Sequence, residues 1–106
     1  MPIFTFLQRD TLRLDAVGER KIYALLQATD VRVQCYAGAL WGDGRITIRA
    51  GIDGDNFVDI EELNADGVSA SIDFRTYAYL AVEVTAASSS AIEVNVAVCA
   101  KSIISN

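Results

Sequence analysis

The sequence predicts an all-β protein, built as a single antiparallel β-sandwich or jelly-roll-like domain of about eight strands. Three observations lead to this prediction. Apolar residues recur at every second position over most of the chain, which is the period of a strand with one buried face and one solvated face. Turn-forming residues interrupt this pattern about every 8–12 residues, as in known sandwiches. The 106 residues suffice for one core.

The alternating segments define the expected strands in chain order. In residues 31–36, for example, Val31, Val33 and Cys35 occupy one face and the residues between them are polar or aromatic. The segment 21–26 alternates less clearly, and its pattern places Ile22 on the apolar face. Residues 19–28 also fit a turn or two of helix. The expected strands span residues 11–16, 21–26, 31–36, 45–52, 58–61, 69–74, 77–84 and 92–98.

The phase of the alternation predicts two hairpin registers. Around the turns at 53–55 and 88–90, apolar side chains stay on one face only if particular residues lie opposite each other. The expected pairs are Ala50 with Val58, Ile48 with Ile60 and Arg49 with Asp59 in the first hairpin, and Val84 with Val94, Thr85 with Glu93 and Glu83 with Asn95 in the second.

The N-terminal segment is too apolar for a free tail. We divide the chain into residues 1–10, an N-terminal arm or edge strand, and residues 11–106, the β-sandwich domain. The arm either completes the domain's own sheet or inserts into a neighbouring subunit as an added strand. Its candidate protein-interface residues are Phe4, Phe6 and Leu7.

Charge and hydropathy limit the kinds of partner. The net charge is −5 and basic residues form no run, so nucleic acid is not expected as a partner. No apolar run reaches the roughly 20 residues that cross a bilayer, and charges within residues 1–20 exclude the apolar centre of a secretory signal. We therefore expect neither membrane insertion nor export.

Cys35 falls on a core phase and Cys99 on the opposite phase of its strand, which predicts two free thiols in a reducing cytoplasm.

The sequence offers no constellation for catalysis. It contains no histidine, which removes Ser-His-Asp and Cys-His chemistry and the commonest metal ligand. The acidic segment 53–56 with Asp59 has possible calcium ligands but lacks an EF-hand pattern, and the same residues suit a hairpin turn. Asp59 and Glu61 are expected to project toward solvent on an ion-paired strand face, and Glu62 is expected to point toward the core side at the end of that strand. We expect no enzyme activity, no cofactor, no metal and no catalytic residue.

Tyrosines supply a second set of candidate contact residues. Tyr23, Tyr36, Tyr77 and Tyr79 all fall on the polar phase of their strands, and Tyr77 and Tyr79 share one face. Exposed tyrosine suits a protein interface, but it also packs locally on sheets and stacks on sugar rings or bases. All three uses remain open for Tyr77 and Tyr79.

Two consecutive stretches resemble a known group of proteins. Residues 39–48, ALWGDGRITI, and residues 51–60, GIDGDNFVDI, are similar to the Trp-Gly strand and Asp-Gly turn of small tailed-bacteriophage virion proteins. The resemblance covers roughly residues 38–100 and departs from the pattern at Arg45, Asp55 and Phe57. It implies a jelly-roll or sandwich domain that decorates or cements capsids, commonly as a homotrimer, or that belongs to a tail or fibre.

Together, these observations predict a non-enzymatic structural virion protein. The expected role is that of a capsid decoration or cement protein, which stabilises the phage shell through contacts with the major capsid protein or other virion proteins. It would be assembled in the host cytoplasm and act in the virion. Trp41 joins the arm residues as a candidate anchor. The alternatives are a tail or fibre component and a carbohydrate- or receptor-binding module, in which Tyr77 and Tyr79 would contact the ligand.

Overall fold

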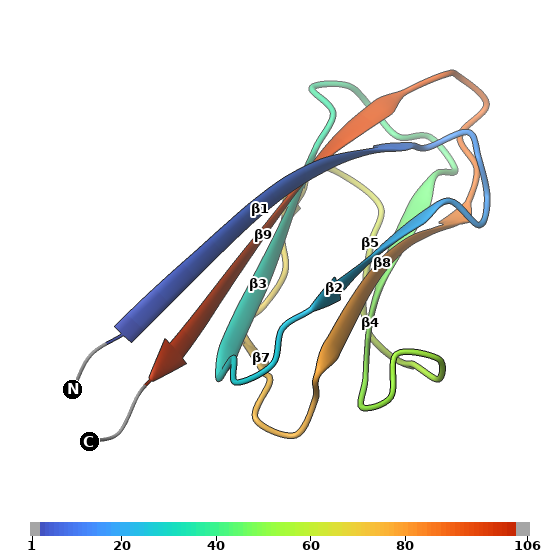
Figure 1. Ribbon diagram of the computed structural model, residues 1–106. Coiled ribbons are helices and arrows are strands. Elements are labelled where there is room, and N and C mark those ends of the chain that lie inside the picture. Colours follow the sequence, from blue (N-terminus) through green and yellow to red (C-terminus); the bar gives the residue numbers. More distant parts are fainter. Residues whose placement is uncertain (1–2, 104–106) are drawn as a thin grey trace.

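The computed structural model describes residues 3–103, which form nine strands and no helix (Figure 1). Every strand pairing is antiparallel. The strands are β1 (Ile3–Arg13), β2 (Arg20–Ala24), β3 (Asp30–Tyr36), β4 (Arg45–Gly51), β5 (Val58–Leu63), β6 (Gly67–Val68), β7 (Ile72–Asp73), β8 (Tyr79–Ala86) and β9 (Glu93–Ile103). This confirms the predicted all-β fold. The described residues hold no helix that could span a membrane.

The strands form two sheets that enclose one core. The five-stranded sheet has the order β1-β9-β3-β6, with β7 also paired to β3, and the four-stranded sheet has the order β2-β8-β4-β5. Apolar side chains from both sheets form a single buried cluster, so the architecture is a β-sandwich. The largest fully buried side chains are Trp41, Phe74, Leu12, Leu14, Ile46, Ile48, Leu80, Val31, Val33, Val82, Val84 and Val94.

The cysteines follow the predicted phases. Cys35 is fully buried in β3, whereas Cys99 is half-buried and pairs with Arg32 on the other face of the same sheet. Both thiols are free. Their side chains leave opposite faces of one sheet, so no bridge forms between them.

The predicted phase of β2 is wrong. Tyr23 and Leu25 are 4% and 5% exposed, whereas Ile22 and Leu26 are 42% and 67% exposed. Tyrosine can occupy the inner face here because its hydroxyl donates a hydrogen bond to Asp10 Oδ2 at 2.8 Å. A polar tip with a half-buried partner, Asp10, therefore reverses the assignment made from hydropathy alone.

The β4–β5 hairpin follows the expected register only next to its turn. Ala50 lies opposite Val58 and Arg49 opposite Asp59, as predicted. The pairing of Ile48 with Ile60 is wrong, because the register shifts between Ile48 and Arg49. A β-bulge shifts the strand by one residue, which no turn composition indicated. Beyond the bulge, Ile48 pairs with Glu61, Thr47 with Glu62 and Ile46 with Leu63.

The predicted β8–β9 hairpin does not form. Val84 pairs with Ile46 in the four-stranded sheet, while Val94 pairs with Leu12 in the five-stranded sheet. The segment 87–92 therefore crosses from one sheet to the other, and the three predicted pairs across it are wrong. Phase correctly places Val84 and Val94 in the core, but a core-facing strand has the same phase in either sheet.

β1 and β9 extend together beyond the other strands (Figure 1). They pair from Ile3 with Ile103 to Arg13 with Glu93, and the molecule measures 50 × 27 × 18 Å along its principal axes. β1 runs without a break across residue 10 and forms the edge of its sheet. Residues 1–2 and the side chain of Phe4 lie outside the described part of the chain. The division at residue 10 stays a prediction.

Candidate protein–protein interface

The candidate interface residues whose side chains are described lie in four separate places. Phe6 and Leu7 are 43% and 55% exposed on opposite faces of β1. Trp41 is only 2% exposed and packs inside the domain. Tyr77 and Tyr79 are half-buried at and just before the start of β8. The structure therefore does not unite these residues in one site, and the arm presents the larger apolar surface.

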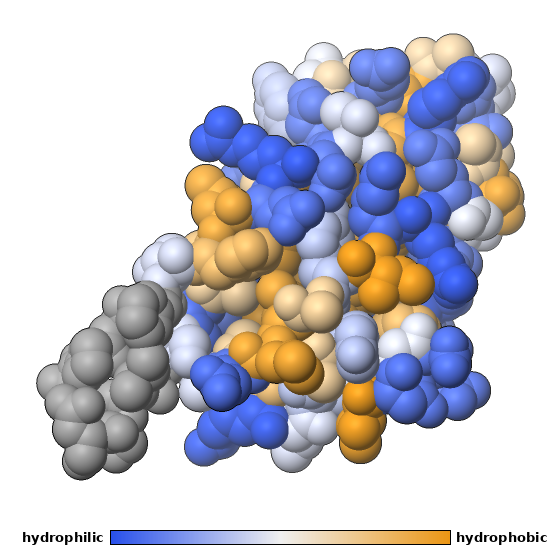
Figure 2. Space-filling model, viewed as in Figure 1, coloured by the Kyte–Doolittle hydropathy of each residue, from blue (hydrophilic) through white to orange (hydrophobic). Residues whose placement is uncertain are grey.

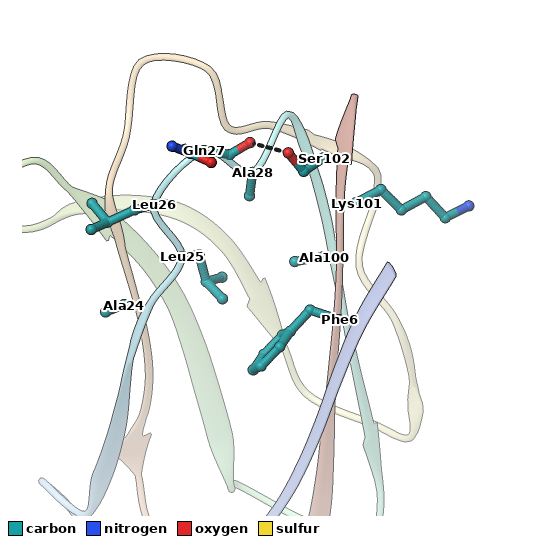
Figure 3. A pocket seen from close by; sticks show the side chains of 9 residues that line it. All are labelled: Phe6, Ala24, Leu25, Leu26, Gln27, Ala28, Ala100, Lys101 and Ser102. Atoms are coloured by element: carbon teal, nitrogen blue, oxygen red, sulfur yellow. Dashed lines mark hydrogen bonds between the residues drawn. The ribbon is translucent and has the colours of Figure 1, made fainter. Parts of the chain in front are cut away.

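Phe6 lies where the five-stranded sheet overhangs its partner sheet. β2 ends at Ala24, and beyond this point the inner face of β1 and β9 is covered only by the loop that leads to β3 (Figure 3). Phe6 pairs with Ala100 there, and both point toward Leu25. The result is a pocket of about 270 Å³. Its lining consists of Phe6, Ala24, Leu25, Leu26, Gln27, Ala28, Ala100, Lys101 and Ser102.

The loop after β2 is held against β9 by hydrogen bonds. The Ser102 hydroxyl donates to the Gln27 carbonyl oxygen at 2.8 Å, and the Thr29 amide donates to the Lys101 carbonyl oxygen at 2.7 Å. Gln27 has a φ of 72°, in the left-handed region that non-glycine residues rarely adopt. This sharp turn directs Leu25 and Ala28 inward and leaves Leu26 exposed.

The pocket is suited to an apolar side chain. Figure 3 shows the ammonium of Lys101 directed away from it, and its inner wall consists of Phe6, Leu25 and Ala100. Its volume lies below the about 300–1,000 Å³ that small-molecule sites usually have. Figure 2 shows apolar patches near the arm and over β2 between polar side chains. Such a surface can bury area against another protein.

A second apolar projection lies in the loop between β3 and β4. Leu40 is 92% exposed at this loop. The Asp66 carboxylate accepts hydrogen bonds from the amides of Ala37 and Gly38 at 2.7 and 2.9 Å, and from Trp41 Nε1 at 2.9 Å. These bonds lower the pKa of Asp66. Sequence reasoning missed both Leu40 and Asp66, because an exposed leucine and a turn aspartate have no periodic signal.

The tyrosines differ in their surroundings. The Tyr77 ring lies 5.7 Å from that of Phe74, centroid to centroid, at 54°, and packs against the core. Burial and the bond to Asp10 raise the pKa of Tyr23. Tyr36 is 54% exposed on the outer face of the five-stranded sheet. The outward, polar-phase position predicted for Tyr23 is thus wrong, and that for Tyr36 agrees with the structure.

The acidic segment after β4 forms a turn. Asp53 Oδ1 accepts hydrogen bonds from the amides of Asp55 and Asn56 at 3.0 and 2.9 Å. These bonds lower the pKa of Asp53 to about 2. Asp59 binds Arg49 at 2.7 Å on the exposed face of β5. Within residues 3–103, no three His, Cys, Asp or Glu side chains form a group that could hold a metal ion.

The carboxylates of β5 lie on two sides of the bulge. Glu62 is exposed and binds Arg45 Nη1 at 2.9 Å, so its predicted core-side orientation is wrong. Glu61 accepts a hydrogen bond from the Ala70 amide at 3.0 Å. The Glu62 carboxylate thus binds the neighbouring strand β4, and the Glu61 carboxylate binds the loop at Ala70. These contacts do not bring the two carboxylates together in one cavity.

Comparisons with known proteins identify the fold. No family model and no curated protein matches the chain. The structure is similar to that of YomS, a protein derived from the SPBc2 prophage, with 8% sequence identity, a TM-score of 0.65 and coverage of 92% of this chain and 96% of that one. It is also similar to a protein of Bacillus endospore appendages, described as a novel family of disulfide-linked pili, with 20% identity, a TM-score of 0.56 and coverage of 97% and 89%. At these identities, the likeness establishes the fold.

Proposed function

We propose that this protein is a non-enzymatic structural virion protein that decorates or cements a bacteriophage shell. One similar structure belongs to a prophage-derived protein and another to a protein of pilus-forming spore appendages, which supports a structural role in an assembly. The resemblance of residues 39–60 to small virion proteins supports the same role independently. The proposed place of action is the virion, after assembly in the host cytoplasm.

The observation that most strongly supports this proposal is the apolar overhang of the five-stranded sheet at the end of the sandwich. Phe6 and Leu26 are 43% and 67% exposed around a pocket whose wall includes Ala100. An isolated domain gains nothing from this exposure, whereas a partner side chain inserted beside Phe6 would bury apolar area worth roughly 25 cal/mol per Å². The proposed occupant is an apolar segment of the major capsid protein or of another virion protein.

The resemblance of residues 39–60 to decoration proteins also suggests a homotrimer on the shell. Multivalent attachment would raise occupancy on a shell without new contacts per subunit. Trp41 does not contribute to this proposal, because its side chain has 2% of its surface exposed. A tail or fibre position would use the same overhang. The carbohydrate-binding alternative receives no specific support, since Tyr77 packs on Phe74.

Particle occupancy tests the proposal. Phage particles carrying the chain are purified through a density gradient, and the bound chain is measured by immunoblotting. We expect Phe6→Ser and Leu26→Ser to lower the occupancy at least about tenfold, the effect of losing ~1.4 kcal/mol of contact energy. Ile52→Ser is the matched control, because Ile52 is 72% exposed in a loop outside the pocket. Absence of the wild-type chain from purified particles would refute the virion role.

A further inference from the structure

The outer edge of β1 offers a long row of unpaired backbone groups. β1 has eleven residues and pairs along its whole length with β9, while no other strand of the described chain pairs with its second side. Its register with β9 contains no bulge. The chain's one proline, Pro2, precedes the strand. β1 therefore lacks two of the features by which edge strands usually avoid pairing with other chains.

The hydrogen bonds at the end of β1 show which residues face this edge. The Leu14 amide donates to the Ile92 carbonyl oxygen at 2.8 Å, in continuation of the β1–β9 ladder. Backbone N–H and C=O groups alternate in direction along a strand. Those of the even-numbered residues of β1 therefore point toward β9, and those of the odd-numbered residues point outward to the open edge. The Arg13 amide agrees with this assignment, since it donates to Glu19 Oε2 at 3.2 Å. Glu19 thus closes the edge at Arg13, and the open part includes Thr5 to Thr11.

We infer that β1 pairs antiparallel with β1 of a second copy of this chain. Length favours this occupant over another strand of the same protein. The other edge strands have five residues in β2, six in β5 and two each in β6 and β7. Another β1 can pair with the whole open segment. The contact would be isologous, with a two-fold axis across β1 that joins two five-stranded sheets.

Charge disfavours two registers of this pairing, and the register centred on Gln8 avoids both. Centring the pair on Arg9 or on Asp10 would place two like charges directly opposite each other, which is unfavourable. Centring it on Gln8 places Leu7 opposite Arg9 of the second copy and Thr5 opposite Thr11. The leucine then packs on the aliphatic part of arginine. The pairing ends at Thr11, next to the amide that Glu19 caps.

This contact is separate from the overhang of the proposed function. The pocket beside Phe6 opens between the sheets, whereas the pairing uses the outward backbone groups of Thr5, Leu7, Arg9 and Thr11. The two can therefore fail independently: a trimeric virion protein without β1 pairing would contradict this inference and leave the virion role intact.

Native mass and a proline substitution test the pairing. We expect wild-type protein to form a dimer in analytical ultracentrifugation, at concentrations up to about 100 μM. Leu7→Pro removes an outward amide without breaking the ladder to β9, and should weaken the dimer at least about tenfold through the two symmetric hydrogen bonds lost. Leu7→Ala is the matched control, because it removes the side chain and keeps the amide. A wild-type monomer, or a dimer that Leu7→Pro leaves unchanged, would overturn the inference.

Disulfide trapping tests the register without requiring the proline variant to fold. Gln8 would face Gln8 of the second copy as a non-hydrogen-bonded pair with Cα atoms about 4.5 Å apart, within the range for a disulfide. In a Cys99→Ser background, mild oxidation of Gln8→Cys should yield a covalent dimer. Thr11→Cys should not, since its two copies would lie roughly 20 Å apart. Equal cross-linking of both variants, or none at Gln8→Cys, would refute the register.

Discussion

The Asp66 carboxylate fixes the loop between β3 and β4 through three hydrogen bonds, to Ala37, Gly38 and Trp41. Trp41 Nε1 would otherwise lack a partner near the core, and an unsatisfied buried donor is costly. Trp41 can therefore be almost fully buried although its indole has a polar N–H. One exposed carboxylate thus allows the largest core side chain to occupy its position.

Asp66 should make the environment of Trp41 dependent on pH. Its pKa is lowered in the folded protein, so its stabilising effect is complete above the unfolded-state pKa of about 3.9 and is lost as the pH falls below that value. Trp41 is the one tryptophan, so fluorescence reports it alone. Asp66→Ala should lower the melting temperature and shift the emission to longer wavelength at neutral pH. Asp43→Ala is the control; equal effects of both would contradict this role.

The two thiols should differ in reactivity. Cys35 is fully buried, and burial, with a smaller contribution from Asp66, raises its pKa to about 12, whereas Cys99 is half-buried. The thiolate is the reactive form, so a disulfide reagent should modify one thiol of the native protein and two after denaturation. In Cys99→Ser, the fast reaction should disappear. Rapid modification of Cys35 in the native state would show that β3 is not held in the core.

At the scale of elements, hydropathy phase predicts which face of a strand is buried but not which strands are neighbours. Val31 and Val33 in β3 and Leu80 in β8 are fully buried, as their phase predicts. The sheet order requires information that period-2 patterns do not contain, because β8 and β9 could belong to one sheet or to two. Likewise, the apolar arm was predictable from residues 1–8, whereas the overhang pocket depends on where β2 ends, at Ala24.

The β4–β5 hairpin depends on the absence of a side chain at Gly51. A Cβ atom there would lie 2.2 Å from the Asn56 carbonyl oxygen, so the backbone of the turn would have to move. Gly51→Ala should reduce the free energy of unfolding by about 1–3 kcal/mol, the usual cost of overpacking. Gly67→Ala is the matched control, because its nearest neighbour would be the Ala65 carbonyl oxygen at 3.9 Å. Urea unfolding of both variants measures the difference, and equal losses would contradict the role of close approach.

At the scale of the whole molecule, the first and last strands are neighbours along their entire length. The chain must bring Ile3 near Ile103 before this ladder can form, so the contacts that complete the sheet are the most distant in sequence. Such topologies fold slowly because the entropy of loop closure is lost before the pairing stabilises the chain. The same arrangement places the start of β1 and the end of β9 at one end of the molecule, where they can contact other subunits (Figure 1).

Deleting residues 1–8 should separate folding from assembly. The deletion retains Leu12 and Leu14, which are fully buried and close the core beside Val94. It removes Phe6 and Leu7, which are both more than two-fifths exposed and so contribute less to folding. We therefore expect the far-ultraviolet spectrum of a β-protein and a melting temperature lower by about 5–10 °C, as for ~1–2 kcal/mol in a domain of this size. Particle occupancy and self-association should both be lost, because the pocket wall and the open edge are removed together.

If the truncated chain is unfolded, residues 1–10 belong to the folding unit and the division at residue 10 is wrong. If it folds and still occupies particles at the wild-type level, the arm has no part in attachment, and the loop at Leu40 becomes the next surface to examine.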